Sequence, residues 1–247
     1  MSLVHDVMIR KLKEHTALSA EESAGLRSLP AQRREAASGE ELVRQGDRPD
    51  VSMVVIRGMV ARYHTLGSGT RQYLSFHIAG DWPDAQTLFI EKMDHAISAV
   101  NNAEVALIPH RNLLALFDRI PSVGFAIWRE TLVDAAIFRE AITNNCSREI
   151  SSRLAHFLCE QYYRAQAAGL LENGFCAFPL SQTQIGEALG ASLTTINRAM
   201  QKLRRMGFFE LQGGWLHIKK WKSLADYGEF TPSYLHLRRA REPLGHR

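Results

Sequence analysis

Short apolar runs separated by glycine and aspartate dominate the chain between Glu41 and Pro109. Glycine and aspartate favour tight turns, so this pattern predicts short β-strands joined by hairpins. Several such strands at even spacing are typical of a barrel or a sandwich. We expect strands at residues 42–43, 51–56, 59–66, 73–78 and 99–109.

Two small amphipathic helices are expected before this β-region, at residues 3–12 and 20–29. The second is preceded by Ser19 and carries Glu22 three positions later, which is the spacing of a capping box. We expect both helices to cover the barrel.

After Pro109 the apolar period changes from two to about 3.6 residues, which indicates helices. A short helix is expected around residues 113–117. Pro121 marks the start of a longer helix that reaches Asn144, because proline is favoured in the first turn of a helix. A further helix is expected at residues 147–168. The polar residues between these two long helical patterns, 144–146, predict the start of a second domain.

The helix that starts at Pro121 is apolar on more than one side. One side can cover the barrel, and the apolar stripe that remains suggests pairing with the same helix of a second copy about a two-fold axis. The alternative is one broad face that is buried within a monomer. The stripe assigned to a dimer interface consists of Phe125, Trp128, Leu132, Ala135, Phe138 and Ile142.

Residues 179–221 predict a helix-turn-helix. Ser181 can cap a first helix, with Gln184 in the capping-box position. Gly190 supplies a sharp turn, and Ser192 can open a second helix. In a helix-turn-helix, the N-terminal half of the second helix meets base edges in the major groove of DNA.

A short hairpin follows the second helix. Residues 208–211 and 215–218 have the pattern of strands, and Gly213-Gly214 between them tolerates the positive φ of a two-residue turn. Helix, turn, helix and hairpin in this order predict a winged helix-turn-helix. The alternative is a helical subdomain that binds no nucleic acid.

The formal net charge of +4 is concentrated towards the C-terminus. Residues 1–110 hold 12 Lys and Arg against 14 Asp and Glu, a balance of −2, whereas residues 191–222 hold seven basic residues and one acid. A compact basic segment fits a contact with phosphates. The positions assigned to DNA binding are Ser181, Gln182, Thr183, Ser192, Leu193, Thr194, Thr195, Asn197, Arg198, Lys202 and Arg205.

From about Leu18 to Tyr227 the chain resembles the Crp/Fnr family of bacterial transcription regulators. The resemblance is carried by LVRQGD (42–47), VSMVVIRGMV (51–60), AGDW (79–82), REISSRLAHFL (148–158) and LSQTQIGEALGASLTTINRAMQKL (180–203). It implies a homodimer that binds a two-fold-symmetric operator and recruits or blocks RNA polymerase, with a barrel that senses a signal.

The fold class expected on this basis is α+β. A sensor barrel with a double-stranded β-helix, or jelly-roll-like, topology is expected at residues 1–120, followed by a dimerisation helix at 121–145. A winged helix-turn-helix at 146–230 and a basic tail at 231–247 complete the expected organisation.

The loop that binds the cyclic phosphate in cyclic-nucleotide-binding members differs here. Those members have a Gly-Glu pair followed by Arg-Ser-Ala, in which the arginine meets the phosphate. This chain has Pro83-Asp84-Ala85-Gln86 at the first position and Asp94-His95-Ala96 at the second. A carboxylate repels an anion, so we expect no cyclic AMP or cyclic GMP bound in the usual mode. The identity of any small-molecule effector, and the residues that would bind it, are unknown.

The recognition helix also departs from the family pattern. Many relatives have Arg-Glu-Thr-Val followed two residues later by arginine, whereas this chain has Leu193-Thr194-Thr195-Ile196 and keeps Arg198. Glutamate accepts from cytosine and arginine binds guanine, so the preferred operator should differ from the usual one. Asn197 and Arg198 are the expected base readers, and Ser181, Thr183 and Thr195 could contact phosphates.

No cofactor, metal or catalytic site is expected. Cys146, Cys159 and Cys176 are far apart without a CxxC pair, and the N-terminal cysteines that hold a cluster in oxygen-sensing members are absent. His64 and His77 are isolated, with no haem or metal-ligand motif around them. GxSxG, Walker A and dinucleotide-binding motifs are also missing, so we expect no enzyme.

The apolar runs are shorter than a membrane span, and the N-terminal residues lack the apolar core of a secretory signal, so a cytoplasmic protein without a membrane partner is expected. An alternative function is that of a sensor or adaptor that acts through a protein partner without binding DNA. That alternative leaves the basic winged segment unexplained.

Overall fold

The computed structural model describes residues 3–238, which fall into two compact units. The units are Met1–Ala135 and Ala136–Arg247, and helix α4 (Pro121–Ser147) runs across their boundary. Residues 239–247 of the expected basic tail lie outside the described part of the chain.

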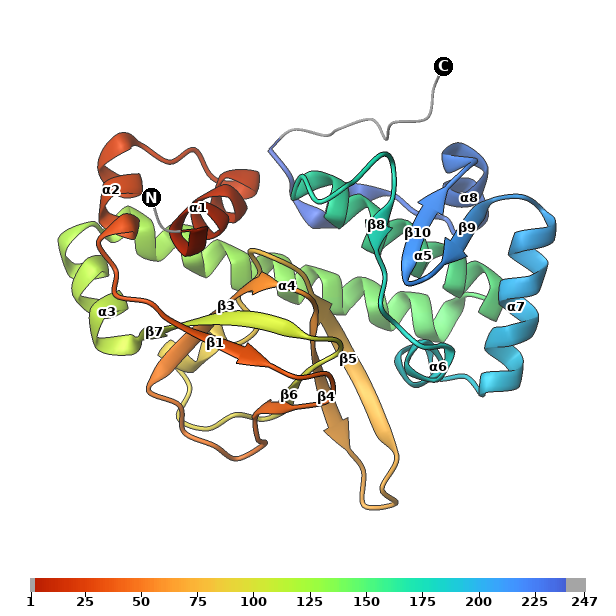
Figure 1. Ribbon diagram of the computed structural model, residues 1–247, viewed down its shortest axis with the longest axis horizontal. Coiled ribbons are helices and arrows are strands. Elements are labelled where there is room, and N and C mark those ends of the chain that lie inside the picture. Colours follow the sequence, from red (N-terminus) through yellow and green to blue (C-terminus); the bar gives the residue numbers. More distant parts are fainter. Residues whose placement is uncertain (1–2, 239–247) are drawn as a thin grey trace. The chain divides into compact units, whose positions relative to one another are not determined.

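The first unit consists of antiparallel strands with helices beside them (Figure 1). One sheet has the strand order β1-β7-β3 and the other β2-β6-β4-β5. In Figure 1, α1, α2 and the start of α4 lie together on one side of these strands. The elements are α1 (Leu3–His15), α2 (Ala20–Arg27), β1 (Gln32–Ala36), β2 (Glu41–Val43), β3 (Val51–Arg57), β4 (Val60–Thr65), β5 (Arg71–His77), η1 (Ala85–Leu88), β6 (Ala96–Ala99), β7 (Ala103–Pro109) and α3 (His110–Arg119).

The core of the first unit lies between the two sheets. Most of its buried side chains come from strands of both sheets, where members of the cluster alternate along β3, β6 and β7, and Met93 comes from the loop before β6. The members are Ala36, Val43, Met53, Val55, Val60, Met93, Ile97, Ala99, Ala103 and Val105. This packing produces the β-rich first unit that the spacing of apolar runs predicts.

Two features of the sheets differ from the predicted strands. Strand β1 (QRREA) is missing from the prediction because only one of its five residues is buried. It is held instead by antiparallel pairing with β7, and Arg33 forms an ion pair with Glu104 of that strand. The single strand expected at residues 99–109 is divided into β6 and β7, because Asn101 and Asn102 lie in a turn between them.

The N-terminal helices follow the sequence pattern closely. Helix α2 begins with the predicted capping box, in which the Glu22 amide donates to Ser19 Oγ at 3.1 Å and the Ser19 amide donates to Glu22 Oε2 at 2.6 Å. Helix α1 extends three residues past its expected end, to His15.

Helix α4 continues through the polar residues 144–146 and ends at Ser147. The interruption between the two long helices therefore lies at Arg148 and Glu149. The polar side chains are used for hydrogen bonds instead of ending the helix. Asn144 Nδ2 donates to the Arg153 carbonyl at 3.1 Å, and Asn145 Nδ2 donates to the Ala188 carbonyl at 3.1 Å. A polar cluster in the sequence therefore anchors the helix to its neighbours.

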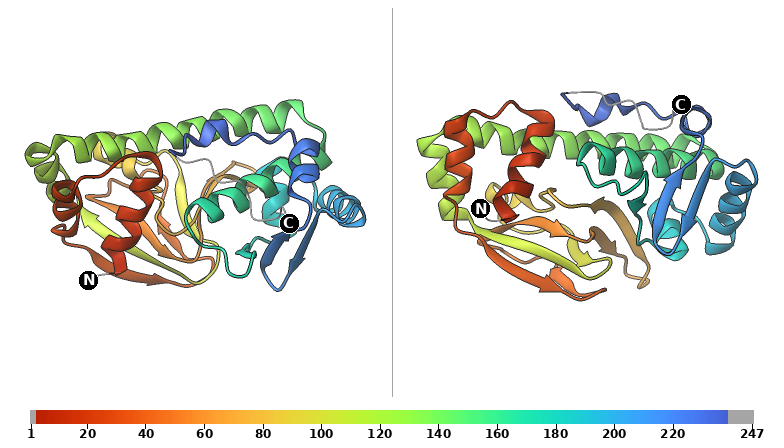
Figure 2. Two further views of the ribbon diagram at one scale, coloured as in Figure 1. Left: turned by 90° about the horizontal axis from the view of Figure 1, so that it is seen from above. Right: turned by 45° about the horizontal axis from the view of Figure 1, so that its top comes forward.

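The second unit is mainly helical, with a small antiparallel sheet of order β8-β10-β9 (Figure 2). Helix α5 packs against α7 and α8, and α6 packs against α7. The elements are α5 (Ile150–Ala167), β8 (Cys176–Ala177), α6 (Gln182–Leu189), α7 (Leu193–Arg205), β9 (Phe209–Gln212), β10 (Trp215–Ile218), α8 (Trp221–Tyr227) and η2 (Pro232–Leu235).

The chain beyond residue 230 differs from the expected basic tail. Residues 232–235 form η2, in which Leu235 is buried. The Tyr234 hydroxyl donates to Glu160 Oε2 at 2.8 Å and lies 3.2 Å from His156 Nε2. This segment is therefore part of the packed second unit, because Leu235 is buried and Tyr234 hydrogen-bonds to α5.

Candidate nucleic-acid interface

The starts of both helices of the helix-turn-helix are fixed by side-chain caps. The Gln184 amide donates to Ser181 Oγ at 3.2 Å, and the Ser181 amide donates to Gln184 Oε1 at 2.9 Å. At α7, the Thr195 amide donates to Ser192 Oγ at 3.2 Å. These caps satisfy amide groups that a helix end leaves without partners, and they confirm the predicted helix starts.

The turn between α6 and α7 depends on two glycines. Gly190 ends α6 in the left-handed conformation, with φ 64° and ψ 39°. A Cβ at Gly186 would lie 2.6 Å from the Ala191 carbonyl oxygen, which is closer than real Cβ atoms come to backbone. The Ala191 amide donates to the Gly186 carbonyl at 2.9 Å. The sharp turn therefore needs a residue without a side chain at position 186 and a residue that adopts positive φ without strain at position 190.

Helix α7 buries apolar residues on one side and exposes mainly polar and basic residues on the other, with Leu193 as an exposed apolar residue in its first turn. Its buried side chains, which pack towards α5 and α6, are Ile196, Ala199, Met200 and Leu203. Four of its exposed side chains recur three and four positions apart along the other side, Thr194, Arg198, Gln201 and Arg205. Leu193, Lys202 and Arg204 are exposed as well. Gln201 is not among the predicted positions, although its place three residues after Arg198 on the outward face would have identified it.

None of the predicted DNA-binding positions is buried in the structure. Gln182, Thr195 and Asn197 are half-buried, and the others are exposed: Ser181, Thr183, Ser192, Leu193, Thr194, Arg198, Lys202 and Arg205. Some are already engaged locally. Ser181 and Ser192 accept the cap hydrogen bonds, and Lys202 Nζ lies 5.4 Å from the centre of the Tyr227 ring. Hydrogen bonding to Tyr227 raises the pKa of Lys202.

The hairpin after α7 has the predicted glycine turn. Gly213 and Gly214 have φ values of 58° and 80°, in the region that glycine adopts without strain. Strands β9 and β10 pair from Gln212 with Trp215 to Phe209 with Ile218. Strand β8, which the sequence pattern does not reveal, pairs with the outer side of β10. This third strand gives the wing a fixed base.

Positive charge surrounds the exposed face of α7. The seven basic residues of segment 191–222 are all exposed: Arg198, Lys202, Arg204, Arg205, Lys219, Lys220 and Lys222. The single acid of this segment, Glu210, forms a 2.8 Å ion pair with Lys219. The field around the recognition helix and the wing therefore attracts phosphates.

Helix α4 exposes an apolar stripe. Four large side chains are half or more exposed: Phe125 by 65%, Trp128 by 53%, Leu132 by 50% and Ile142 by 64%. Ala135 and Phe138, also assigned to this stripe, are half-buried. The opposite side is buried and includes Val123, Ile127 and Val133. The alternative of one broad buried face is thus wrong for the described chain, because four large apolar residues remain exposed.

The loop in the place of the cyclic-phosphate cassette is tied into the first unit. Asp84 is buried, and its Oδ1 accepts a hydrogen bond from the Met53 amide at 2.8 Å. Burial raises the pKa of Asp84 to about 7. In the second part of the cassette, His95 Nδ1 lies 2.7 Å from Asp94 Oδ1, and burial lowers the pKa of His95. Asp84 and Asp94, the two acidic residues of this region, therefore both have hydrogen-bond partners within the protein.

Other classes of site find no support in residues 3–238. These residues bring no three His, Cys, Asp or Glu side chains into an arrangement that could hold a metal ion. None of their helices combines the length and the hydropathy that crossing a lipid bilayer requires. A cavity of about 300 Å³ in the first unit is lined by residues that include Arg34, Arg48, Met53 and Asp84.

Comparison with known proteins covers both units. Residues 33–120 match the cyclic nucleotide-binding domain, and residues 152–227 match the Crp-like helix-turn-helix domain. The chain is 25% identical over 215 residues to Electron transport regulator A of Shewanella oneidensis, covering 87% of this chain and 85% of the relative. It is 24% identical over 175 residues to Transcriptional activator protein FnrA of Stutzerimonas stutzeri, covering 71% of each.

A similar fold is found in the solved structure of FixK2 from Bradyrhizobium japonicum. The TM-score is 0.73 at 24% sequence identity, and the match covers 81% of this chain and 98% of the other. The matched domains lie in the order that the sequence motifs indicate, a β-rich domain followed by a winged helix-turn-helix. The chain therefore belongs to the Crp/Fnr family of transcription regulators, whose helix-turn-helix domain binds DNA.

Proposed function

We propose that this regulator binds a two-fold-symmetric operator as a homodimer and reads it with α7. The observation that carries the proposal is the exposed face of α7, where Thr194, Arg198, Gln201 and Arg205 project from a helix whose other side is apolar. A helix of this kind enters the major groove with its N-terminal half against base edges.

Base reading is assigned to Arg198 and Asn197. An exposed guanidinium can bind guanine through two hydrogen bonds, and an amide can do the same with adenine. Gln201, one turn further along, is the third reader. Ser181, Thr183 and Thr195 hold phosphates, together with the helix N-termini and the wing lysines, so that they set the register without specifying sequence.

The second copy is expected to pair through the exposed stripe of α4. A two-fold axis brings the same stripe of both copies together, so an apolar surface meets an apolar surface. Burying Phe125, Trp128, Leu132 and Ile142 in both copies removes large aromatic and aliphatic area from water, which stabilises the pair. Pairing also places two recognition helices about one DNA turn, ~34 Å, apart.

The remaining parts of the proposal concern ligands and location. The regulator acts in the cytoplasm on RNA polymerase, carries out no catalysis, and needs no cofactor. It does not bind cyclic AMP or cyclic GMP in the usual mode, since the carboxylate of Asp94 stands where the family's arginine would meet the phosphate. Isothermal calorimetry should detect no micromolar affinity for either nucleotide.

Selection of bound fragments from random duplexes, followed by fluorescence anisotropy, tests the proposal. A palindromic site should emerge, and its affinity should fall steeply with salt because bound phosphates release counterions. An adaptor that works through a protein partner alone would give no enriched site and no salt-dependent retention on DNA.

A further inference from the structure

Two acidic side chains lie on the inner side of α4, one turn apart. Glu130 is buried, and its oxygens lie 3.9 Å from Lys11 Nζ and 3.8 Å from His15 Nε2, both on α1. Asp134 forms an ion pair with Arg62 of β4. Carboxylates are expensive to bury, so their presence on this side needs a reason beyond covering the core.

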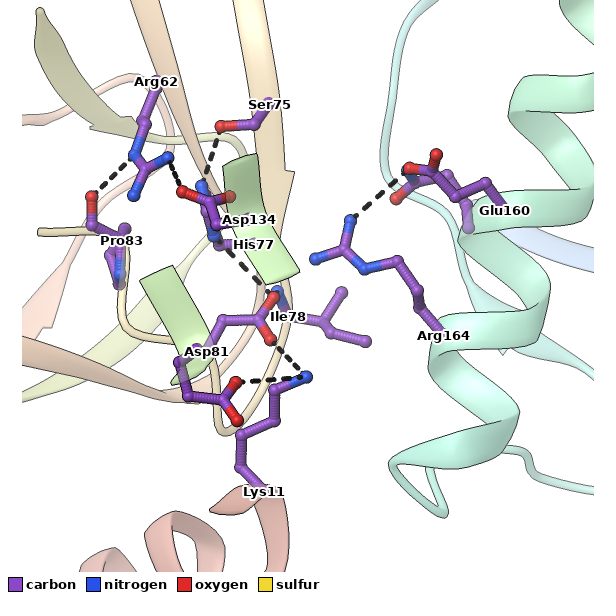
Figure 3. Close-up of polar contacts among 12 residues, drawn as sticks. Lys11, Arg62, Ser75, His77, Ile78, Asp81, Pro83, Asp134, Glu160 and Arg164 are labelled. Atoms are coloured by element: carbon purple, nitrogen blue, oxygen red, sulfur yellow. Dashed lines mark hydrogen bonds and ion pairs between the residues drawn. The ribbon is translucent and has the colours of Figure 1, made fainter. Parts of the chain in front are cut away.

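Arg62 is almost fully enclosed, with 3% of its side chain exposed. Its Nη1 donates to Asp134, its Nε donates to the Pro83 carbonyl at 2.6 Å, and its Nη2 lies 3.5 Å from Gln86 Oε1. Figure 3 shows the guanidinium between Pro83 and Asp134. The planar group therefore joins three parts of the first unit, which are β4, residues 83–86 at the start of η1, and α4.

The partners of Arg62 include the cassette loop. Pro83 and Gln86 belong to the segment that stands in the place of the Gly-Glu pair of cyclic-nucleotide-binding members. The charge of Arg62 also acts on the second cassette segment. Burial is the main cause that lowers the pKa of His95, and the positive charge of Arg62 is the next. The guanidinium of Arg62 therefore lies close to both parts of the cassette, although Arg62 itself is on β4 and outside them.

We infer that Arg62 and Asp134 replace the arginine and the phosphate of a ligand-gated cassette, with the chain's own carboxylate as the anion. In the ligand-gated members, arginine and ligand meet at this loop. Here the same kind of charge pair joins the loop directly to α4, so DNA binding needs no effector anion. This inference rests on the proposed function and adds how the sensor unit acts on it.

The pair would act by fixing the rotation of α4 about its own axis. Leu132 and Asp134 are two positions apart, about 200° around a helix, so they lie on opposite sides. Holding Asp134 against Arg62 keeps Leu132, Trp128 and Phe125 outward, where a second copy meets them. An apolar contact alone fixes this rotation weakly, because α4 is apolar on several sides. A charge pair between enclosed Arg62 and half-buried Asp134 tolerates no other rotation without loss of its partner.

The first experiment measures the dimer by sedimentation and operator affinity by anisotropy, on full-length protein refolded from denaturant to remove small molecules. The wild type should bind without additions. Asp134→Asn and Arg62→Ala should each weaken operator binding at least tenfold, and the double variant Arg62→Ala/Asp134→Asn should cost no more than Arg62→Ala alone, since the two residues act as one unit. Arg44→Ala, which removes an exposed ion pair with Glu41, is the control and should leave affinity unchanged.

Chemical rescue separates this role from a purely structural one. Millimolar methylguanidinium should restore dimerisation and operator binding to Arg62→Ala, whereas sodium chloride at the same ionic strength should not. If Arg62→Ala does not fold by circular dichroism, Arg62→Lys serves in its place and should give an intermediate affinity, because it keeps the charge but loses the planar group.

The inference is overturned by wild-type operator affinity in Arg62→Ala and Asp134→Asn, by additive costs without rescue, or by a wild type that needs a small molecule for binding. Failure of the proposed function gives a different result. In that case the refolded wild type binds no duplex with or without cell extract, and the variants cannot be distinguished from it.

Discussion

Helices α7 and α4 obey the same amphipathic rule with opposite chemistry. Helix α7 buries only apolar residues and exposes mainly polar and basic ones, whereas α4 exposes Phe125, Trp128 and Leu132 and buries Glu130 with half-buried Asp134 beside it. An exposed basic face suits a charged, hydrated partner such as DNA, and an exposed apolar stripe suits a second protein surface. The chemistry of the exposed side therefore separates the two kinds of interface.

The strongest way to break this contrast is to place a charge in the apolar stripe. Leu132→Asp would bury an unpaired carboxylate at the proposed interface in both copies, which costs about 3–5 kcal/mol when a charge is left without a partner. We expect a monomer by sedimentation and a loss of operator affinity of more than a hundredfold. Leu66→Asp, at another exposed leucine, is the control and should stay dimeric. A dimeric Leu132→Asp would remove α4 from the interface.

The next largest effect concerns the turn that orients α7. Gly186→Ala forces a Cβ against the Ala191 carbonyl oxygen, so we expect a loss of about 3 kcal/mol in the stability of the second unit. Gly67→Ala meets no atom within 4 Å and should be neutral. Denaturant unfolding monitored by tryptophan fluorescence measures both. Equal stability of the two variants would show that the turn relaxes without cost.

The basic residues of α7 and of the wing can be divided into those that read bases and those that contact phosphates. Arg198→Ala should cost about 2 kcal/mol at the selected operator and relax the preference at one base pair per half-site. Lys219→Ala should cost less, weaken all duplexes alike and lower the salt slope by about one. Anisotropy titrations at several salt concentrations compare the two. A uniform loss in Arg198→Ala would assign Arg198 to the backbone.

The smallest effect is a dependence of stability on pH, which comes from Glu130 on the buried side of α4 and from Asp84 in the loop before η1. Burial raises the pKa of Glu130 to about 8 and that of Asp84 to about 7, so the folded first unit binds protons that the unfolded chain releases above about pH 4. Stability of this unit should therefore fall as pH rises from about 4 to 8, by about 1 kcal/mol or more.

Lys11 lowers the pKa of Glu130, and Glu14, Asp81 and Asp134 raise it, so the response belongs to this cluster. Glu130→Gln and Asp84→Asn should flatten the profile measured by thermal unfolding. The buried side of α7 holds no titrating group among its described residues. In the second unit burial lowers the pKa of His156 to about 4, so the stability of that unit should rise with pH from about 4 to 6.5 and not share this slope. A profile that rises with pH in the wild type would contradict the assignment.

Sequence patterns predicted the parts of the fold that rest on local chemistry. The caps at Ser19, Ser181 and Ser192 and the turn at Gly213-Gly214 follow from residue type and spacing, and the structure confirms them. The β-rich first unit, long helix and winged helix-turn-helix appear in the predicted order.

The parts that sequence patterns did not reveal depend on partners distant in the chain. Strand β1 has no apolar alternation and is defined by its pairing with β7. The ion pair between Arg62 and Asp134 joins residues 72 positions apart, and nothing in the local pattern of either residue indicates the other. The assigned DNA-binding and interface residues remain predictions, since exposure makes such roles possible without testing them.

Hydroxyl-radical footprinting of the selected operator tests the central claim most directly. Two protected patches on one face of the duplex, related by a two-fold axis and centred about one helical turn apart, are the result expected if a dimer places α7 in successive major grooves. A single unsymmetrical patch, or no protection of any duplex by folded protein at moderate salt, would contradict the account.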